Sequence, residues 1–431
     1  MRKMKDSGIP WIGEIPADWS IVKIKAGVHK VGSGKTPSGG ATTYADEGVL
    51  FLRSQNVYDT GLELSNPTYI TPEVDEEMKG TRVFPNDVLL NITGGSIGRC
   101  CIFPETLETA NVNQHVSIIR VNKNVFLPEF MHYYWISPLG SMAISLYQTG
   151  GNREGMSAEA IKNTPIILMP LVEQKLICKV LDAKCAEIDA VLDKTRTSIE
   201  EYKKLKQAII TQAVTKGIRG DRPMKESGVI WLDTVPAEWT ISKIKYTIFP
   251  KEKPVLPMDE VITCFRDGTV TLRRNRREEG FTISFTENGY QGVDVGDLVI
   301  HGMDTFAGAI GCSDSRGKTS PVVHVCSTVG NNRYFMYFLR YMAYSGVLMD
   351  FSNGVRIRSS DFRNFKKLAV FEMLVPPLRE QNKIVDYLDS TLAKIDQVIK
   401  QKEILISELE ACKKSAIYEY VTGKKEVPNA Y

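Results

Sequence analysis

Two long stretches of the chain carry apolar residues at the spacing of a coiled-coil helix. They run from Glu173 to Thr215 and from Glu380 to Thr422, and each opens on the pattern Pro-x-x-Glu-Gln. Because neither stretch contains a proline, each is predicted to form one uninterrupted helix, roughly 60 Å long at about 1.5 Å per residue. The residues predicted to form the apolar seams are Leu181, Ile188, Leu192, Ile199 and Tyr202 in the first helix and Leu388, Leu392, Ile395, Ile399 and Leu409 in the second.

The two predicted helices are suitable partners for each other, because neither has enough chain beside it to bury so long an apolar stripe. Lys206 and Lys413 interrupt the seams at equivalent places, and a charged seam residue tends to fix the register of paired helices. We expect an antiparallel pair if a twofold axis relates the two halves, and a parallel pair if they form a translational array. Packing of each helix on its own domain is the remaining alternative. We take the seam residues as candidate subunit-interface residues, and we expect outward apolar residues such as Ile177, Val191 and Leu205 to need covering.

A second repeated segment, which we call the head, precedes each helix in the sequence. Residues 4–25 and 224–245 share the pattern Trp-x4-Pro-x-x-Trp, and four of the chain's five tryptophans belong to it. The matching residues are Trp11, Pro16 and Trp19 in the first head and Trp231, Pro236 and Trp239 in the second. The chain is therefore a duplicated two-part unit, and we interpret the heads as packing devices that place the chain's entry over each domain.

Between head and helix, each half contains short β-like runs and one helical stretch. Examples of the runs are 88–92 in the first half and 280–285 and 297–300 in the second. The predicted fold class is α+β, with two pseudo-repeated mixed α/β domains joined by two long antiparallel coiled-coil spacer helices. The predicted boundaries are 1–165 for the first domain, 166–216 for the first helix, 217–372 for the second domain and 373–431 for the second helix.

Composition restricts the class of protein further. No apolar run approaches the roughly 20 residues of a membrane-spanning helix, and Met1–Asp6 lacks the apolar region of a signal peptide. The eight cysteines show no paired spacing and the five histidines form no zinc pattern. We therefore expect a cytoplasmic protein with reduced thiols and no metal site. Because the net charge is only +3, any surface that binds nucleic acid must be local.

No arrangement of residues predicts catalysis by this chain. The segment Gly32–Thr36 resembles the end of a phosphate-binding P-loop, but His29 stands where the first glycine is required. Pro37, Gly39 and Gly40 disfavour the helix that such a loop needs. We predict a loop there that touches phosphate at most, and we predict no catalytic residue.

Arginine and amide side chains gather at several predicted turns, and these are the groups that contact phosphates and purine edges. A solvated charged loop is the alternative in the second half, since Glu278 and Glu279 follow the arginines. The candidate DNA-binding residues are Arg53, Gln55, Asn56, Asn152 and Arg153 in the first half and Arg266, Arg273, Arg274, Arg276, Arg277, Arg356 and Arg358 in the second. Gln148, Asn113 and Gln114 are weaker candidates that we expect to be structural.

The chain resembles the specificity subunit of a type I restriction-modification system over essentially its full length. The two Trp-x4-Pro-x-x-Trp heads and the two Pro-x-x-Glu-Gln helix starts carry the resemblance. Further matching phrases are Asp87–Gly94, Asn113–Val116 and Gln148–Gly151 in the first domain, and Gly296–Asp304 and Ser359–Phe362 in the second.

This resemblance implies a non-catalytic subunit that recognises double-stranded DNA. Each domain would be a target recognition domain for one half of a bipartite sequence, and the helices would set the gap and dock two modification (methyltransferase) subunits. Those partners would bind S-adenosylmethionine, this chain would bind no cofactor, and restriction (motor and nuclease) subunits would join the full complex. Two alternatives stay open. One is a methyltransferase fused to its own recognition domain, which the missing cofactor and catalytic motifs disfavour. The other is a scaffold that binds no DNA, for which loss of the charges from Arg273 to Arg277 would leave function unchanged.

Overall fold

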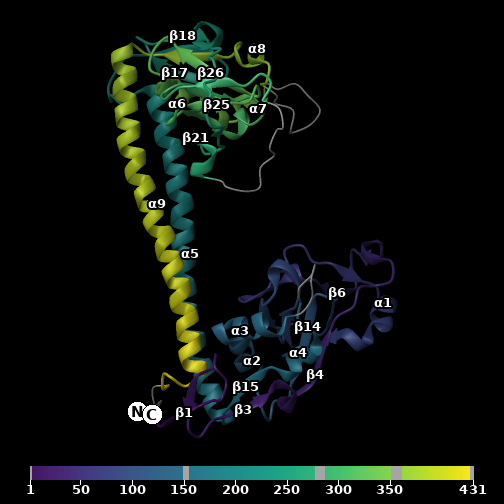
Figure 1. Ribbon diagram of the computed structural model, residues 1–431. Helices are drawn as coiled ribbons and strands as arrows, with labels where there is room; N and C mark the ends of the chain where they lie inside the picture. The colour runs from purple at the N-terminus through teal and green to yellow at the C-terminus, as the bar shows by residue number, and fades with distance from the viewer. Residues whose placement is uncertain (1, 149–154, 277–286, 351–361, 428–431) are drawn as a thin grey trace. The chain divides into compact units, whose positions relative to one another are not determined.

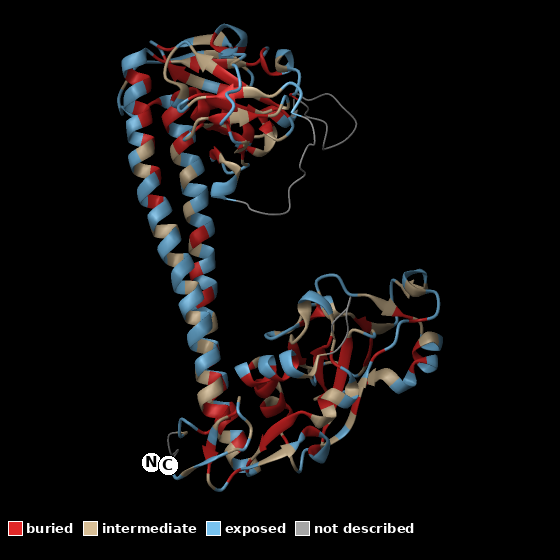
Figure 2. Cartoon of the chain, in the orientation of Figure 1, coloured by how far each residue is buried: buried red, intermediate tan, exposed pale blue. Residues whose placement is uncertain are grey.

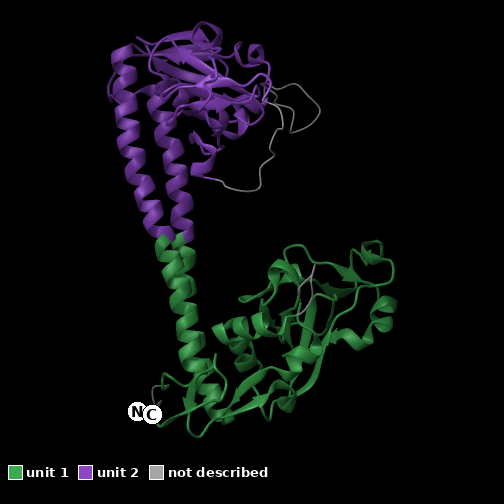
Figure 3. Ribbon diagram, viewed as in Figure 1, with its two compact units in different colours: residues 1–195, 404–431 green, residues 196–403 purple. Residues whose placement is uncertain are grey.

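The computed structural model describes residues 2–148, 155–276, 287–350 and 362–427 (Figure 1). The chain divides into two compact units, Met1–Thr195 with Ile404–Tyr431 and Arg196–Glu403 (Figure 3). Each unit therefore contains one head, one mixed α/β domain and part of both long helices. The boundaries predicted from the sequence, which separate the helices from the domains, stay a prediction.

The elements of the first unit follow each other in a strand-rich order that ends in three short helices and one strand. The strands are β1 (Met4–Asp6), β2 (Glu14–Pro16), β3 (Ser20–Lys23), β4 (Val28–Ser33), β5 (Tyr44–Ala45), β6 (Val49–Leu52), β7 (Val57–Tyr58), β8 (Gly61–Leu62), β9 (Tyr69–Ile70), β10 (Arg82–Val83), β11 (Val88–Asn91), β12 (Cys100–Ile102), β13 (Ala110–Val112), β14 (Val116–Val121) and β15 (Pro165–Leu168). The short helices are α1 (Pro72–Glu77), α2 (Pro128–Ile136), α3 (Pro138–Tyr147) and α4 (Ala158–Asn163).

The second unit has a similar order. Its strands are β16 (Met224–Val229), β17 (Leu232–Pro236), β18 (Thr240–Lys243), β19 (Ile248–Pro250), β20 (Ile262–Cys264), β21 (Val270–Leu272), β22 (Gln291–Val293), β23 (Leu298–His301), β24 (Ile310–Cys312), β25 (Gly317–Thr319), β26 (Val323–Thr328) and β27 (Glu372–Val375). Its short helices are α6 (Asn332–Tyr344), α7 (Val347–Asp350) and α8 (Phe365–Leu368). The long helices are α5 (Leu171–Lys216) and α9 (Leu378–Val421), each shared by both units. The strand run predicted at 280–285 lies outside the described residues.

The two domains share one central sheet. In the first the strand order is β12-β11-β14-β4, and in the second the corresponding order is β24-β23-β26-β19, with every neighbouring pair antiparallel. In both units the strand before the long helix, β15 or β27, pairs with the strand after the head, β3 or β18. The domains differ beside this frame, because the first adds the five-stranded sheet β10-β13-β6-β9-β5 and the second adds two two-stranded sheets.

The long helices begin and end by the same local chemistry. The carbonyl groups of Pro170 and Pro377 accept the first helical hydrogen bonds, from Gln174 and from Glu380 and Gln381. Each helix ends at a glycine in the left-handed region, Gly217 (φ 77°) or Gly423 (φ 70°), a conformation that glycine adopts without the cost of a Cβ clash.

Inside each unit the segments of α5 and α9 lie side by side and run antiparallel. In the first unit Asp189 on α5 pairs with Lys413 on α9 at 2.7 Å, and the start of α5 lies beside the end of α9. In the second unit Lys206 pairs with Asp396, and the Lys402 ammonium lies 5.8 Å from the Tyr202 ring centroid. The seam lysines therefore occupy equivalent sites on the two helices, each opposite an aspartate.

The core of each unit continues from the sheet onto the helices (Figure 2). Residues at matching positions are buried in both: Ile177, Leu181 and Ile417 in the first unit correspond to Ile384, Leu388 and Ile210 in the second. The expectation that Ile177 faces outward is wrong, because it is buried beside the head. None of the described helices has an apolar stretch long enough to cross a lipid bilayer.

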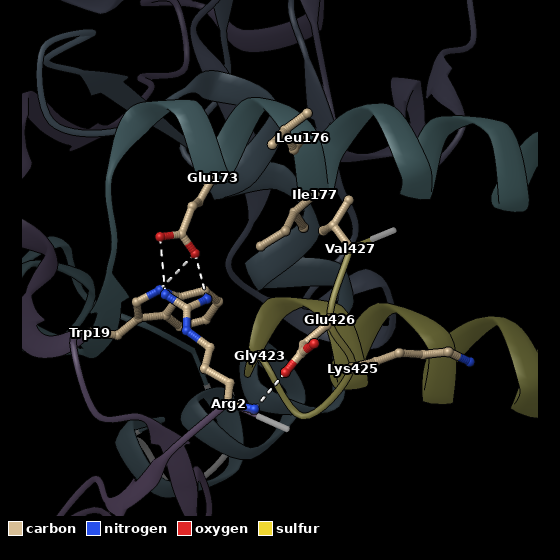
Figure 4. Close-up of a pocket in the computed structure, with 9 residues that line it drawn as sticks. All are labelled: Arg2, Trp19, Glu173, Leu176, Ile177, Gly423, Lys425, Glu426 and Val427. Carbon is tan, nitrogen blue, oxygen red and sulfur yellow. Dashed lines mark hydrogen bonds and ion pairs between the residues drawn. The ribbon is translucent and has the colours of Figure 1, made fainter. Parts of the chain in front are cut away.

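The glutamate of each Pro-x-x-Glu-Gln motif binds the head of its own unit. In the first unit the Glu173 carboxylate accepts hydrogen bonds from Trp19 Nε1 at 3.0 Å and from Arg2 Nη1 at 2.6 Å (Figure 4). In the second unit the Glu380 carboxylate accepts from Trp239 Nε1 at 2.9 Å and from Arg222 Nη2 at 3.1 Å. We call this arrangement the head lock.

The glutamine that follows fixes the helix start to the domain. In the first unit Gln174 Nε2 donates to the Val125 carbonyl at 2.8 Å, and its Oε1 accepts from Leu127 N at 2.9 Å. In the second unit Gln381 Oε1 accepts from Asn331 N at 2.9 Å. The motif thus joins helix, head and domain in each unit.

Replacing Glu380 by alanine tests the head lock. Burial alone would raise the pKa of Glu380, but hydrogen bonds from Arg222 and Trp239 outweigh it and hold that pKa below its ordinary value. The Arg222 side chain is 7% exposed, so Glu380→Ala leaves a buried charge without its main partner and should cost roughly 3 kcal/mol of unfolding free energy. Denaturant unfolding followed by circular dichroism measures this loss.

Glu238→Ala is the matched control, because Glu238 pairs with the same arginine but is 54% exposed, and its loss should cost less than about 1 kcal/mol. Since the pKa of Glu380 is depressed in the folded state, its contribution is complete above the unfolded-state pKa and disappears as the pH falls through the folded-state value. Equal effects of the two substitutions at neutral pH would contradict the head lock.

Candidate nucleic-acid interface

Several loops of the first domain meet at one edge of its sheets. β6 and β13 are parallel neighbours, and β4 and β11 both pair antiparallel with β14, so the ends of β4, β6, β11 and β13 lie together with the start of β14. Backbone hydrogen bonds connect the loops: Lys35 N donates to the Val112 carbonyl at 3.0 Å, and Asn113 N donates to the Leu52 carbonyl at 3.0 Å. We call this region the first polar edge.

Polar side chains of the first polar edge form a connected chain of hydrogen bonds. The Thr36 hydroxyl binds Gln114 Oε1, and Gln114 Nε2 lies 3.2 Å from His115 Nε2. On the other side of the imidazole ring, His115 Nδ1 lies 2.6 Å from Thr93 Oγ1. Residues from three different loops are therefore held in one network, and Gln114 itself is exposed. Gln114, a weaker candidate in the sequence, shares with the other residues of this network a position just after a strand.

Glycine is needed where the first of these loops closes onto the sheet. A Cβ atom on Gly34 would lie 2.0 Å from the Val112 carbonyl oxygen, which is closer than any real contact. Gly34 therefore lets the loop after β4 approach the β13–β14 turn, and this approach brings Thr36 within reach of Gln114.

The candidates from the loop after β6 have three different environments. Gln55 is exposed. Arg53 is half-buried, with Nη2 donating to Thr68 Oγ1 at 2.8 Å and its guanidinium 5.8 Å from the Tyr44 ring centroid. Asn56 is buried, and its amide accepts from Arg53 N at 2.9 Å and donates to the Glu63 carbonyl at 2.8 Å. Asn56 therefore stabilises the loop, and the expectation that it contacts DNA is corrected.

The second domain has a corresponding edge at the end of β23. Gly302 N donates to the Val322 carbonyl and Phe362 N donates to the Gly302 carbonyl, both at 2.8 Å. At the first polar edge, Ile92 N and Met156 N donate the equivalent pair of backbone hydrogen bonds. His301 and Asp304 lie here, and Arg266 Nη2 donates to Asp304 Oδ1 at 2.9 Å. Burial lowers the pKa of His301, which favours a neutral imidazole. This is the second polar edge.

Two of the three other described candidate arginines of the second domain pair with acidic side chains. Arg274 pairs with Glu260 at 2.7 Å, and Arg276 Nη1 donates to Asp267 Oδ1 at 2.9 Å. The Arg276 hydrogen bonds lower the pKa of Asp267 to about 2, so both partners stay charged at neutral pH. Arg273 directs Nε toward Thr263 Oγ1 at 3.4 Å. The structure thus places Arg266 at the second polar edge and the other three around the β20–β21 hairpin.

Five candidates cannot be placed, because they lie outside the described residues: Asn152, Arg153, Arg277, Arg356 and Arg358. Gly155, which follows Asn152 and Arg153 in the sequence, belongs to the first polar edge because it forms a β-bridge with Thr93. Phe362, which follows the last two, belongs to the second polar edge through Gly302.

The predicted seam residues are buried or half-buried in their own units. They are Leu181, Ile188, Leu192 and Leu409 in the first unit and Ile199, Tyr202, Leu388, Leu392, Ile395 and Ile399 in the second. Leu181 belongs to the core of the first unit, and Leu388 and Leu392 belong to the core of the second. Other apolar residues of the helices remain exposed, among them Val191, Leu205, Ile404 and Leu405, and these are the ones available to a partner.

The structure offers one cavity beside a head lock. A hollow of about 400 Å³ in the first unit is lined by the head-lock residues together with Leu176, Ile177 and the segment 423–427 (Figure 4). In it the Arg2 backbone nitrogen donates to Glu426 Oε1 at 2.6 Å, and the Arg2 guanidinium pairs with the Glu173 carboxylate. Among the described residues, no group of three or more His, Cys, Asp or Glu side chains is placed to hold a metal ion.

Comparisons with known proteins agree with this geometry. Residues 16–201 match the family model described as a type I restriction modification DNA specificity domain. The MjaX type I restriction enzyme specificity subunit of Methanocaldococcus jannaschii is 22% identical over 435 residues, which cover 96% of each chain. The EcoBI specificity subunit of Escherichia coli is 26% identical over 188 residues, 42% of this chain and 39% of that one.

A solved chain from a study of assembly and conformational transition in a type I restriction-modification system has the same fold. It superposes with a TM-score of 0.68 at 15% identity and covers 95% of this chain and 99% of that chain.

Two domains with one central sheet, each tied to a long helix by the same lock, define a protein built by internal duplication. The resemblance found in the sequence is confirmed: the chain is similar to the DNA specificity subunits of type I restriction-modification systems.

Gly34→Ala tests how the first polar edge is built. The added methyl group would collide with the Val112 carbonyl, so the loop must move and the subunit should lose roughly 1–3 kcal/mol of stability. Denaturant unfolding measures the loss. Gly32→Ala is the control, since a Cβ atom there meets nothing within 4 Å. Comparable stability of the two variants would contradict the close approach.

Proposed function

We propose that this chain directs a methyltransferase complex to a bipartite DNA sequence, with each unit recognising one half-site. The observation behind the proposal is that the same structural frame occurs in both units while their polar edges differ. The central sheet, the head lock and the helix start recur in both units, whereas the polar edges present different side chains. A repeated frame with divergent edges is what recognition of two different half-sites requires.

The long helices are proposed to set the gap between the half-sites. α5 and α9 are each one continuous helix with residues in both units. Each unit also fixes the register of its own helix segments with an ion pair, Asp189–Lys413 or Lys206–Asp396. Helical residues add a constant length of about 1.5 Å each, and a spacer of this kind favours one gap.

The exposed apolar residues of the helices are proposed to dock two modification (methyltransferase) subunits. Val191, Leu205, Ile404 and Leu405 have between 40% and 50% of their surface exposed, and large exposed apolar side chains that cluster mark interaction surfaces. S-adenosylmethionine would bind to those partners, while this chain would bind no cofactor and carry out no catalysis. Restriction subunits would join the same assembly for cleavage.

Lengthening the helices tests this proposal. Four residues inserted after Ile199, with four more after Lys402 in α9, should lengthen the gap by about one or two base pairs, because four helical residues add roughly 6 Å. Both half-site sequences should stay unchanged. The measurement is single-molecule sequencing of methylated adenine in cells that express the variant with its methyltransferase partner.

The control replaces Glu200, Glu201, Lys203 and Lys204, which are exposed, by alanine without changing the helix length, and it should keep the original gap. An altered half-site together with an unchanged gap in the lengthened protein would refute the proposed role of the helices.

A further inference from the structure

Gln114 is an exposed amide held at both ends by its own domain. The Thr36 hydroxyl binds Gln114 Oε1, and His115 Nε2 lies 3.2 Å from Gln114 Nε2. His115 is itself fixed, because its Nδ1 lies 2.6 Å from Thr93 Oγ1, its backbone nitrogen donates to Asn113 Oδ1 at 3.1 Å, and its carbonyl accepts from Ile92 N at 3.0 Å. A solvated surface glutamine would rotate freely, whereas this one has a set orientation.

The hydrogen bonds within the domain leave one donor and one acceptor of the Gln114 amide unused. A glutamine side chain has two N–H donors and two acceptor lone pairs. When Gln114 donates one N–H to His115 Nε2, the His115 proton lies on Nδ1 and is donated to Thr93. Thr36 occupies one lone pair, so one N–H and one lone pair remain. Exchanging the two ends of the amide leaves the same two groups.

One donor beside one acceptor matches one base. In the major groove adenine presents N7 as an acceptor beside the N6 amino donor, whereas guanine presents two acceptors, cytosine an amino donor and thymine a carbonyl acceptor. Glutamine makes its bidentate contact with adenine for this reason.

We propose that Gln114 reads an adenine in the half-site of the first unit through the major groove, and that Thr36 and His115 are positioning residues that orient its amide. This inference rests on the proposed function, and it assigns one base contact within it. The surroundings suit the role: Lys35 is exposed in the same loop as Thr36, and Gln55 is exposed in the loop after β6, so a cation for phosphate and a second polar group flank the amide.

The first test changes the amide and records the methylated sequence. In the complex with its methyltransferase partner, Gln114→Ala should make one fixed A·T pair of the first half-site degenerate, and this pair is not the one that carries the methyl group. Gln114→Glu, which offers acceptors alone, should shift the preference at that pair toward cytosine, whose amino group faces the major groove. The gap and the second half-site should stay the same in both variants.

Gln55→Ala is the matched control, because it removes a neighbouring exposed amide that lies outside the Thr36–Gln114–His115 network. It should leave that A·T pair fixed. Relaxation of the pair in Gln55→Ala with none in Gln114→Ala would overturn the assignment, and so would a change confined to the second half-site.

The second test modifies the DNA and keeps the natural protein, so it does not depend on how a variant folds. Duplexes carry 7-deazaadenine, which pairs normally but lacks the N7 acceptor, at each adenine of the first half-site in turn. At the read position the natural complex should bind roughly 10- to 100-fold more weakly, and Gln114→Ala should show no further loss there. Equal losses in both proteins would overturn the inference.

The proposed function and the base assignment can fail separately. If the complex methylates no bipartite sequence, the proposed function fails. If the bipartite sequence is found and no A·T pair of it responds to Gln114, the base assignment alone fails.

Discussion

A carboxylate in the first turn of each long helix is the group on which the rest of each unit depends. Glu173 and Glu380 are placed where a helix N-terminus favours a negative charge, and each accepts hydrogen bonds from a head tryptophan and from an arginine two residues before the head. Buried charges are tolerated when they are paired and hydrogen-bonded. The lock therefore joins two parts of the chain that are more than a hundred residues apart, and the adjacent glutamine joins the helix start to the α/β domain.

This constraint explains why the frame repeats while the edges differ. Head, helix start and central sheet must fit each other in both units, so the same residue types recur at matching places. The loops beyond β4, β11 and β23 lie at the polar edges, and their side chains differ between the units. Gln114 and His115 lie at the first polar edge, whereas His301, Asp304 and Arg266 lie at the second.

Sequence reasoning predicts the parts that follow a regular period and misses those that depend on how distant loops meet. The seam positions and Lys206 and Lys413 were predictable, because heptad spacing fixes which residues share a helix face. Ile177 was misplaced because the head covers a helix face that the periodicity marks as outward. Asn56 was misassigned because the sequence looks the same whether an asparagine side chain in a turn hydrogen-bonds to its own loop or contacts DNA.

Gln114 is only a weaker candidate in the sequence for a related reason. Its orientation comes from Thr36 and His115, and only the sheet topology brings these loops together. No local sequence pattern shows that these loops come together. The candidate base contacts are therefore the part of the protein that the sequence predicts least well.

The most direct measurement of the central claim is the adenine methylation pattern of cellular DNA when the unaltered chain is expressed with its methyltransferase partner. The account predicts a single sequence in two parts, separated by a gap of constant length. Methylation at an uninterrupted sequence, or at two half-sites with a variable gap, would contradict the proposal that each unit recognises one half-site and that the helices set the gap.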